Sequence, residues 1–332
     1  MAITEPSKHH FDVMGVFIGA HIVSSQKKVL ITTFVLFLSA CNSDSSTTNV
    51  GGYNNNNWQL VWFDEFSGSS IDTSKWSWAT NCWGGGNNEL QCYTDRLDNS
   101  YIQSGSLIIK ARQETFTGPA EPLGSNTNAG NRTLPYTSAR LLTKNKGDWK
   151  YGRIEVRAKL PAGQGIWPAI WMLPTHDVYG SWAASGEIDI MESVNINPSI
   201  PSTHKVHGNL HFGGSWPLNA HVGNDTTLGK DPSQNFHTYA IDWAADQMRW
   251  YVDGVLYGTI PSSSWYSTPS NSQIAGPYAP FDQDFHLLLN VAVGGNWPGA
   301  PDHTSSLPVQ MEVDYVRVYS CQTAPSSLSS CQ

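Results

Sequence analysis

The stretch Ala184–Asn195 reads ASGEIDIMESVN and places three carboxylates, Glu187, Asp189 and Glu192, in an otherwise apolar run. Ionised carboxylates taken out of water are costly unless they are paired or hydrogen-bonded, so a purely structural strand would rarely carry three of them. The stretch therefore predicts a buried strand that presents chemical groups on one face.

The spacing of the three carboxylates also predicts an irregularity in this strand. Side chains alternate between the two faces of a regular strand, so Glu187 and Asp189 point the same way and Glu192 points away. A β-bulge at Ile190 and Met191 would add one residue and return Glu192 to the face of the other two. With that bulge, the three carboxylates line one concave face.

Carboxylates arranged in this way fit glycoside hydrolysis, in which one carboxyl group attacks the anomeric carbon and another protonates the leaving oxygen and later activates water. Asp189, between the other two, can hydrogen-bond the nucleophile and separate the pKa values of its neighbours by its charge. The alternative is a site for a hard metal ion such as calcium, which oxygen-rich clusters also bind. The 14 Trp, 13 Tyr and 11 Phe residues favour sugar rings over an ion.

The remainder of the chain from Trp58 consists of short runs that alternate polar and apolar residues between clusters of Gly, Pro, Asn and Ser. It shows no long 3.6-residue period and no repeat of fixed length. We expect one all-β sandwich domain over residues 58–320. Residues 113–135 form the longest region without strand character and are predicted to be a surface loop. The expected strands are 58–66, 106–112, 138–144, 151–160, 166–173, 186–193, 205–212, 235–243, 247–254, 285–293 and 311–320.

The N-terminal residues 1–40 are interpreted as a targeting segment, because Lys27 and Lys28 precede the apolar run VLITTFVLFLSA. The run ends at LSAC and resembles a bacterial lipoprotein signal, with Cys41 as the lipidated residue. Residues 41–57 are polar and would act as a flexible tether. The apolar run is too short to predict a permanent membrane span. We expect an exported protein that a lipid holds on the membrane or cell surface, or one secreted through a plain signal.

Four cysteines remain after Cys41, and an even number agrees with export. We predict the local disulfides Cys82–Cys92 and Cys321–Cys331, the second of which closes a short tail over residues 321–332. A zinc site is the alternative, but the chain has no CxxC spacing to support one.

The charge balance of 19 basic against 27 acidic side chains leaves no basic footprint, which excludes nucleic acid as a partner. We expect a monomer that contacts a membrane only through its lipid and acts on a polysaccharide.

The run GEIDIMES resembles the active-site strand of glycoside hydrolase family 16, and its bulged form is similar to that of the laminarinases, the endo-1,3-β-glucanases. The resemblance covers residues 58–320 and implies a concanavalin-like β-jelly-roll with an open substrate groove on the concave face. It also implies cleavage inside the polymer with retention of configuration and no cofactor for catalysis. The matching motifs, in order, are WFDEFSG, NNELQCYTDR, YTSARLLTK, YGRIEVRAKLPAGQGIWPAIWMLP, HGNLHFGG, NVAVGGNWPG and MEVDYVRVYS.

The resemblance implies that Glu187 is the nucleophile, Asp189 its supporting residue and Glu192 the acid/base. It further implies six substrate-binding residues: Asn88, Glu89, Arg140, Trp171, Trp182 and His211.

Two more tryptophans are candidates on their own sequence context. Trp297 follows glycines and precedes a proline in GGNWPG, which is typical of an exposed loop aromatic. Trp167 belongs either to the sugar-binding surface or to the core, because it alternates with apolar residues in IWPAIW.

The resemblance also implies a structural calcium ion on the convex side, at Glu65, the backbone of Gly105 and Asp314. The alternative is that Glu65 and Asp314 are strand-end residues that face solvent.

The leading functional hypothesis is an endo-hydrolase of β-1,3-glucan or of mixed β-1,3/1,4-glucan. A second is an enzyme for agar, carrageenan or porphyran, against which the net charge of −8 argues because sulfated chains call for basic residues. A third is a non-catalytic glucan-binding module, a class that tends to lose the three carboxylates retained here.

Overall fold

The computed structural model describes residues 57–122, 125, 127, 129–322 and 327–331. The described residues all belong to one compact unit, Gly51–Gln332. The predicted signal, the lipidation site Cys41 and almost all of the tether lie outside the described residues. In the part of the chain that is described, no helix has the length and apolar character needed to cross a membrane.

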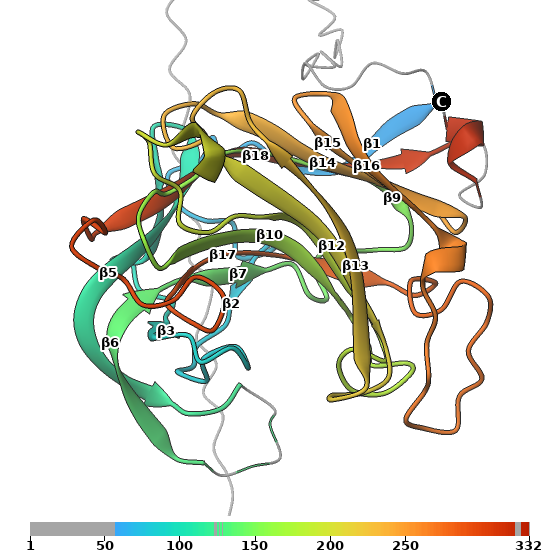
Figure 1. Ribbon diagram of the computed structural model, residues 1–332, viewed down its shortest axis with the longest axis horizontal. Helices are drawn as coiled ribbons and strands as arrows, with labels where there is room; N and C mark the ends of the chain where they lie inside the picture. Colours follow the sequence, from blue (N-terminus) through green and yellow to red (C-terminus); the bar gives the residue numbers. More distant parts are fainter. Residues whose placement is uncertain (1–56, 123–124, 126, 128, 323–326, 332) are drawn as a thin grey trace, which may run out of the picture. The chain divides into compact units, whose positions relative to one another are not determined.

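Two β-sheets pack face to face in this unit (Figure 1). The ten-stranded sheet is antiparallel except for the parallel pair of its two last strands. Its order is β16 (Val255–Pro261), β15 (Gln247–Val252), β14 (His237–Trp243), β9 (Gly152–Lys159), β18 (Val309–Cys321), β5 (Ser106–Pro119), β6 (Asn131–Ser138) and β3 (Gln91–Tyr93), with β1 (Trp58–Asp64) paired to β18 and β4 (Ser100–Gln103) to β5.

The second, eight-stranded sheet is antiparallel and contains the strand with the three carboxylates, β11. Its order is β13 (Asn219–Thr227), β12 (Lys205–Gly213), β11 (Glu187–Glu192), β10 (Ile166–Pro174), β17 (Phe285–Val293), β7 (Arg140–Leu142) and β2 (Ser77–Trp78), with β8 (Asp148–Trp149) paired to β17. Three short 3-10 helices complete the described elements: η1 (Pro201–Thr203), η2 (Ser262–Ser264) and η3 (Leu328–Cys331).

The core lies between the two sheets and is filled by the inward-facing apolar residues of both. Ile154 and Val156 of β9 meet the same cluster as Ile170 and Met172 of β10, and all four are fully buried. Burial of one such side chain stabilises the fold by about 1.5–3 kcal/mol. The predicted all-β sandwich is confirmed, and its two packed sheets form a β-jelly-roll.

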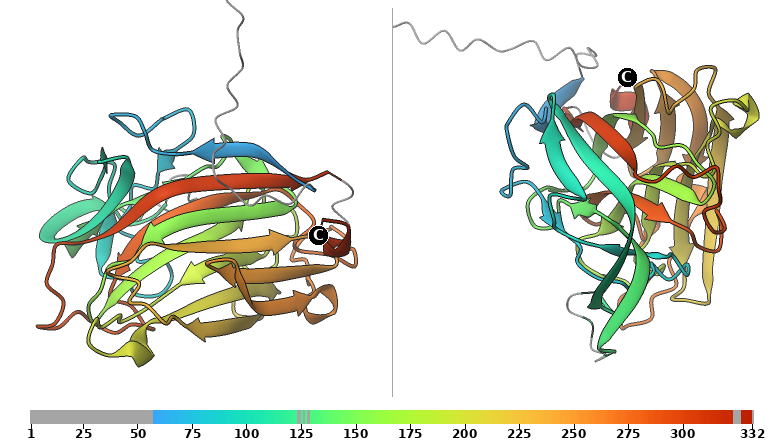
Figure 2. Two further views of the ribbon diagram at one scale, coloured as in Figure 1. Left: turned by 90° about the horizontal axis from the view of Figure 1, so that it is seen from above. Right: turned by 90° about the vertical axis from the view of Figure 1, so that its left-hand side faces the viewer.

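The prediction of a surface loop over residues 113–135 is wrong. Strand β5 continues to Pro119 and β6 begins at Asn131, so most of this region is a β-hairpin, seen along its length in the right-hand view of Figure 2. The hairpin has a largely solvated face, for which polar residues suffice, and Thr117 and Thr133 hydrogen-bond across it at 2.7 Å. Because these residues are mostly polar, the sequence pattern did not predict strands in this region.

The disulfide Cys82–Cys92 is confirmed and supports this hairpin. Both cysteines are buried in a small cluster with Leu134 and the partly buried Phe116. The backbone N–H of Cys82 donates to the carbonyl of Pro119 at 2.7 Å. The bridge therefore ties Cys82 to Cys92 of β3 and packs against the hairpin.

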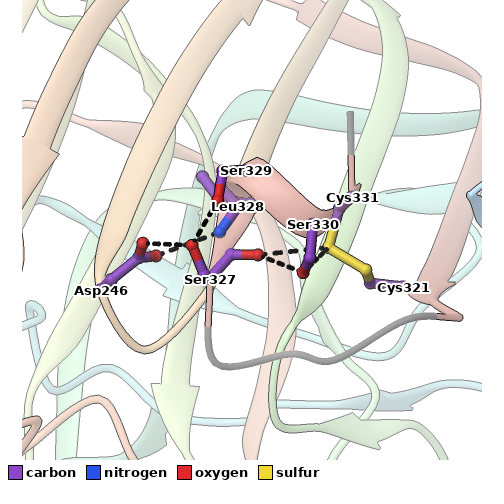
Figure 3. Close-up of a disulfide and its surroundings, with 7 residues drawn as sticks. All are labelled: Asp246, Cys321, Ser327, Leu328, Ser329, Ser330 and Cys331. Atoms are coloured by element: carbon purple, nitrogen blue, oxygen red, sulfur yellow. Dashed lines mark hydrogen bonds between the residues drawn. A yellow bond between two sulfur atoms is a disulfide. The ribbon is translucent and has the colours of Figure 1, made fainter.

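The second predicted disulfide, Cys321–Cys331, is also confirmed and attaches the C-terminal tail to the domain. Asp246 accepts hydrogen bonds from the Ser327 hydroxyl at 2.8 Å and from the backbone N–H of Leu328 at 3.1 Å (Figure 3). Leu328 and Cys331 pack in one buried cluster with Trp58. Residues 327–331 of the tail are thus part of the packed structure.

Candidate active site

The predicted bulge is present in β11. Asp189 pairs with Asn209 of β12 and Glu192 pairs with His207, so Ile190 and Met191 together face the single residue Gly208. Both bulge residues are buried in the core. The bulge returns Glu192 to the outward face of the sheet, which also carries Glu187 and Asp189.

A tryptophan from the other sheet supports the bulge from beneath. Trp250 of β15 is fully buried and donates its indole N–H to the backbone carbonyl of Asp189 at 2.8 Å. A side chain at Gly208 would collide with the Trp250 ring. The glycine opposite the bulge therefore allows the indole to satisfy a carbonyl beside the site.

Sheet register assembles the site from residues distant in sequence. One row across the outward face carries Arg140, Asn290, Ala169, Glu192 and His207 on successive strands. Cross-strand neighbours lie about 5 Å apart, so side chains in adjacent rows also come within reach.

The next two rows carry the other carboxylates. Trp171 lies beside Asp189, which lies beside Asn209. Glu187 lies beside His211 of β12. Trp171, the two carboxylates and His211 come from three different motifs of the sequence, and the pairing of β10, β11 and β12 joins these motifs into one site.

Glu187 accepts a hydrogen bond from the indole N–H of Trp182 at 2.8 Å. The His211 Nε2 atom lies 3.8 Å from Glu187 Oε1 and 3.3 Å from Asp189 Oδ2. Burial, and then the charge of Asp189, raise the pKa of Glu187 to about 8, against the opposing effects of His211 and Trp182. The ionised form of Glu187 thus depends on the cation and donor beside it.

His211 supplies that cation. Burial lowers the pKa of the imidazole, but the contact with Asp189 and the charges of the three carboxylates outweigh burial and raise the pKa to about 9. The imidazole is therefore protonated at neutral pH and partly neutralises the acidic cluster.

Glu192 accepts a hydrogen bond on each carboxyl oxygen. The indole N–H of Trp167 donates to Oε1 at 3.0 Å, and the Asn209 amide donates to Oε2 at 3.2 Å. Burial, followed by the charges of Asp189 and Glu187, raises the pKa of Glu192 well above its usual value. Glu192 is thereby set to carry a proton in the resting site.

Of the predicted sugar contacts, Arg140 is held by aromatic rings. Its guanidinium lies 4.4 Å from the Tyr93 ring centre and 5.1 Å from that of Trp171. One Arg140 nitrogen lies 3.8 Å from the Glu89 carboxylate. The Glu89 residue is only 3% exposed, and its carboxylate accepts a hydrogen bond from the Gln91 side-chain amide at 2.6 Å. Glu89 therefore orients Arg140 and offers little surface of its own.

Asn88 occupies the exposed loop that follows Cys82. It has a positive φ of 56° and donates its amide to Asn296 at 3.0 Å. This contact joins the loop to the segment that carries Trp297.

The predicted tryptophans lie on the outward face with different exposure. Trp182 and Trp297 are 36% and 44% exposed, which agrees with the loop position expected for Trp297. Trp167 packs edge-on against Trp297, with ring centres 5.3 Å apart. Because Trp167 contacts Glu192 as well, the core alternative for it is wrong. Trp171 donates its indole N–H to Asn290 at 2.7 Å.

Two asparagines of the site were missed by the sequence reasoning, Asn209 and Asn290. Asn290 is a buried polar residue inside the apolar run FHLLLNVAV, a signal that could have been used. Asn209 stands between His207 and His211 in HGNLH, and only the strand register shows that it reaches Glu192.

The residues predicted for calcium do not fit an ion as they are arranged. Both oxygens of Glu65 accept hydrogen bonds from Arg317, at 2.7 and 2.9 Å. Asp314 forms an ion pair with Arg157 at 2.5 Å. Gly105 lies in the turn between β4 and β5. Each carboxylate is neutralised by a different arginine, which a calcium ion would have to displace.

Among the described residues, one group of three metal-binding side chains comes together, Glu187, Asp189 and His211, with ligand atoms within 4.8 Å of one another. The imidazole Nε2 already contacts both carboxylates, at 3.8 Å from Glu187 and 3.3 Å from Asp189, so the three side chains form an internal charge cluster.

A jelly roll with carboxyl groups gathered on the outward face of one sheet, among exposed indoles, defines a glycoside hydrolase. Comparison with known proteins agrees. The sequence profile described as "Glycosyl hydrolases family 16" matches residues 86–317, and the chain belongs to this family.

Relatives extend the match beyond the profile. The chain is 44% identical over 271 residues to glucan endo-1,3-beta-glucosidase A1 of Niallia circulans, which covers 78% of this chain and 37% of that protein. It is 42% identical over 272 residues to a beta-glucanase of Rhodothermus marinus, covering 79% of this chain and 85% of that protein. The X-ray structure of the laminarinase from Rhodothermus marinus matches with a TM-score of 0.66 at 41% identity, over 80% of this chain and 98% of that one.

Proposed function

We propose that this chain is an endo-acting, retaining glycoside hydrolase that cleaves β-1,3-glucan of the laminarin type or mixed β-1,3/1,4-glucan. The observation that carries the proposal is the β11 bulge, which puts Glu187, Asp189 and Glu192 on one face beside indole rings. The names of the two relatives, a glucan endo-1,3-beta-glucosidase and a beta-glucanase, support the substrate.

In the first step, the ionised Glu187 attacks the anomeric carbon while Glu192 gives its proton to the leaving oxygen. The glycosidic bond breaks and a glycosyl ester of Glu187 forms. The Trp182 indole and the His211 cation favour the carboxylate form of Glu187, and Asp189 holds His211 in place.

In the second step, the ionised Glu192 takes a proton from water, the water oxygen attacks the same carbon, and Glu187 leaves as a carboxylate. The two inversions restore the original configuration. The two N–H donors on Glu192 stabilise its charged form between the steps. Side chains and water supply every group in this double displacement, and the catalysis of the family needs no cofactor.

The test is hydrolysis of a panel that contains laminarin, lichenan, agarose and carrageenan by the soluble domain. Laminarin should be cut fastest, with internal products and retained configuration. Glu187→Gln fills the same volume but cannot attack carbon, so its turnover should fall by more than about 10³-fold while folding is intact. Replacement of Glu187 by Gly with added azide should restore cleavage with inverted product.

Three outcomes would overturn the proposal. Faster hydrolysis of agarose or carrageenan than of both glucans would assign the enzyme to another class of substrate. Binding of laminarin without hydrolysis would indicate a glucan-binding module. Substantial hydrolysis by folded Glu187→Gln would remove Glu187 from the nucleophile position.

We propose further that the domain is exported and anchored by a lipid on Cys41. The lysines before the apolar run and two disulfides in the folded domain support this placement.

A further inference from the structure

Asn209 bridges two strands on the outward face of the sheet. Its Nδ2 atom donates to Glu192 Oε2 on β11 at 3.2 Å. Its Oδ1 atom lies on the opposite side, over Gly223 of β13, where any side chain would collide with the amide. The missing side chain at position 223 thus leaves the space in which the amide lies.

This arrangement fixes which end of the amide faces the carboxyl group. The β12 register places Asn209 beside Asp189, and the side chain leans from there toward Glu192. Trp167 approaches the other oxygen of Glu192 from β10. The carboxyl group is therefore held between two donors from two different strands, and rotation about its terminal bond would break both contacts.

We propose that Asn209, seated over Gly223, is a positioning residue for the acid/base Glu192: it orients the carboxyl group toward the leaving oxygen and stabilises the carboxylate left after proton transfer. The inference rests on the proposed function and adds a residue to it that neither the sequence motifs nor the resemblance assigned.

The charged surroundings of Glu192 give this role a measurable sign. Glu187 and Asp189 on its own strand favour its protonated form, and His211 on β12 favours its carboxylate. His207, its cross-strand neighbour, has its pKa lowered by burial and is neutral. Loss of the Asn209 donor removes a stabilising contact of the carboxylate, so the pKa of Glu192 should rise.

The experiment compares the wild type with Asn209→Ala and Asn209→Asp. With laminarin, kcat/KM of Asn209→Ala should fall on the order of tenfold, and its alkaline limb should move up by about 0.5–1 pH unit. With a dinitrophenyl β-laminaribioside, whose leaving group needs no proton, kcat/KM should change less than about twofold. Asn209→Asp adds a like charge and should move the alkaline limb further upward.

The matched control is Asn224→Ala, which removes a half-buried amide from the adjacent strand β13. It should leave the alkaline limb in place. A carbon-13 NMR titration of the Glu192 carboxyl group, assigned with Glu192→Gln, reads the same pKa change without turnover. Asn209→Leu, which keeps the branched shape and the number of non-hydrogen atoms of the Asn side chain, repeats the measurement if the alanine variant is poorly folded.

Two results overturn the proposal. An unchanged Glu192 titration with unchanged laminarin kinetics in folded Asn209 variants shows that the contact does not act. Equal losses on laminarin and on the dinitrophenyl substrate show a general structural role. A third result separates the two proposals: the Asn209 variants change the Glu192 pKa in the NMR titration, but the wild type hydrolyses none of the substrates. The contact between Asn209 and Glu192 then exists, but the proposed function is wrong and the contact has no role in catalysis.

Discussion

At the scale of single residues, the site is a balance of charge among side chains that are largely buried. Three carboxylates lie around one protonated imidazole, and the indoles of Trp167 and Trp182 each donate to one of the outer two. Trp182 donates to Glu187 and Trp167 donates to Glu192, and the His211 cation lies beside Glu187. This asymmetry lets two chemically identical side chains take opposite protonation states.

The pH dependence of kcat/KM should follow from His211. In the wild type, activity rises as Glu187 ionises and falls as Glu192 and His211 lose protons, so the profile is bell-shaped. In His211→Gln the cation that favours ionised Glu187 is gone, so the pKa of Glu187 rises and the acidic limb moves to higher pH by about one unit. The profile with laminarin between pH 4 and 10 measures this shift.

His207→Gln is the matched control, because burial lowers the pKa of His207 and its removal takes away no charge at neutral pH. Its acidic limb should stay in place. An acidic limb of His211→Gln that stays in place or moves down would show that His211 does not control the ionisation of Glu187.

Sequence alone could place the three carboxylates, because their spacing on one strand and the cost of burying them are local facts. It could not place the Trp167 or Asn209 contacts with Glu192. Those contacts depend on which residues of β10 and β12 lie opposite β11, and register is set by long-range pairing. For the same reason the arginine partners of Glu65 and Asp314 were not foreseen.

At the scale of secondary-structure elements, the bulge in β11 decides which face Glu192 occupies. It turns both Ile190 and Met191 into the core, and Trp250 satisfies the adjacent carbonyl. A strand without the extra residue could present the same three carboxylates if its sequence were one residue shorter.

Deletion of Met191 tests this argument. The shortened GEIDIES alternates regularly and keeps all three carboxylates on one face, so the protein should fold and retain some glucanase activity. Loss of the buried Met191 side chain should still lower the free energy of unfolding by about 2–4 kcal/mol. Urea unfolding and the ratio of laminarin to lichenan hydrolysis measure the two effects, and the ratio should change because Glu192 shifts along the strand.

Deletion of Ile188 is the matched control, since it reverses the faces of residues that follow in a regular segment and should prevent folding. If the Met191 deletion is as completely unfolded as the Ile188 deletion, the bulge argument is contradicted.

The strands that the sequence predicted and those it missed differ in burial. Central strands such as β17 are buried at every residue and read as continuous apolar runs. The missed strands β13 and β16 lie at the edges of the two sheets. Half-buried and exposed residues alternate along the polar run NAHVGNDTT of β13, and β16 leaves its apolar residues Val255 and Leu256 exposed. An edge strand needs half the apolar residues of a central one, so composition identifies it poorly.

At the scale of the whole molecule, the disulfides Cys82–Cys92 and Cys321–Cys331 close loops at separate places on the domain. The first supports the β5–β6 hairpin and the second attaches the tail. Such bridges persist in an oxidising compartment, which agrees with the proposed export of the domain.

The proposed export predicts that Cys41 carries a lipid. Cells fed an alkyne-labelled fatty acid should yield a labelled protein in the membrane fraction, and Cys41→Ala should lose the label and most of its membrane association. Cys82→Ala combined with Cys92→Ala is the control, which should keep the label. Membrane association without label in the wild type would point to another mode of anchoring.

The described ends of the domain lie beside each other. The backbone N–H of Gln322 donates to the carbonyl of Asn57 at 3.0 Å, and Trp58 shares a buried cluster with Cys331. A short peptide could join the two ends at a small cost in loop-closure entropy. The jelly roll is thus suited to circular permutation: new ends could be opened at the exposed turn around Gly254, on the far edge of the sheet from the β5–β6 hairpin.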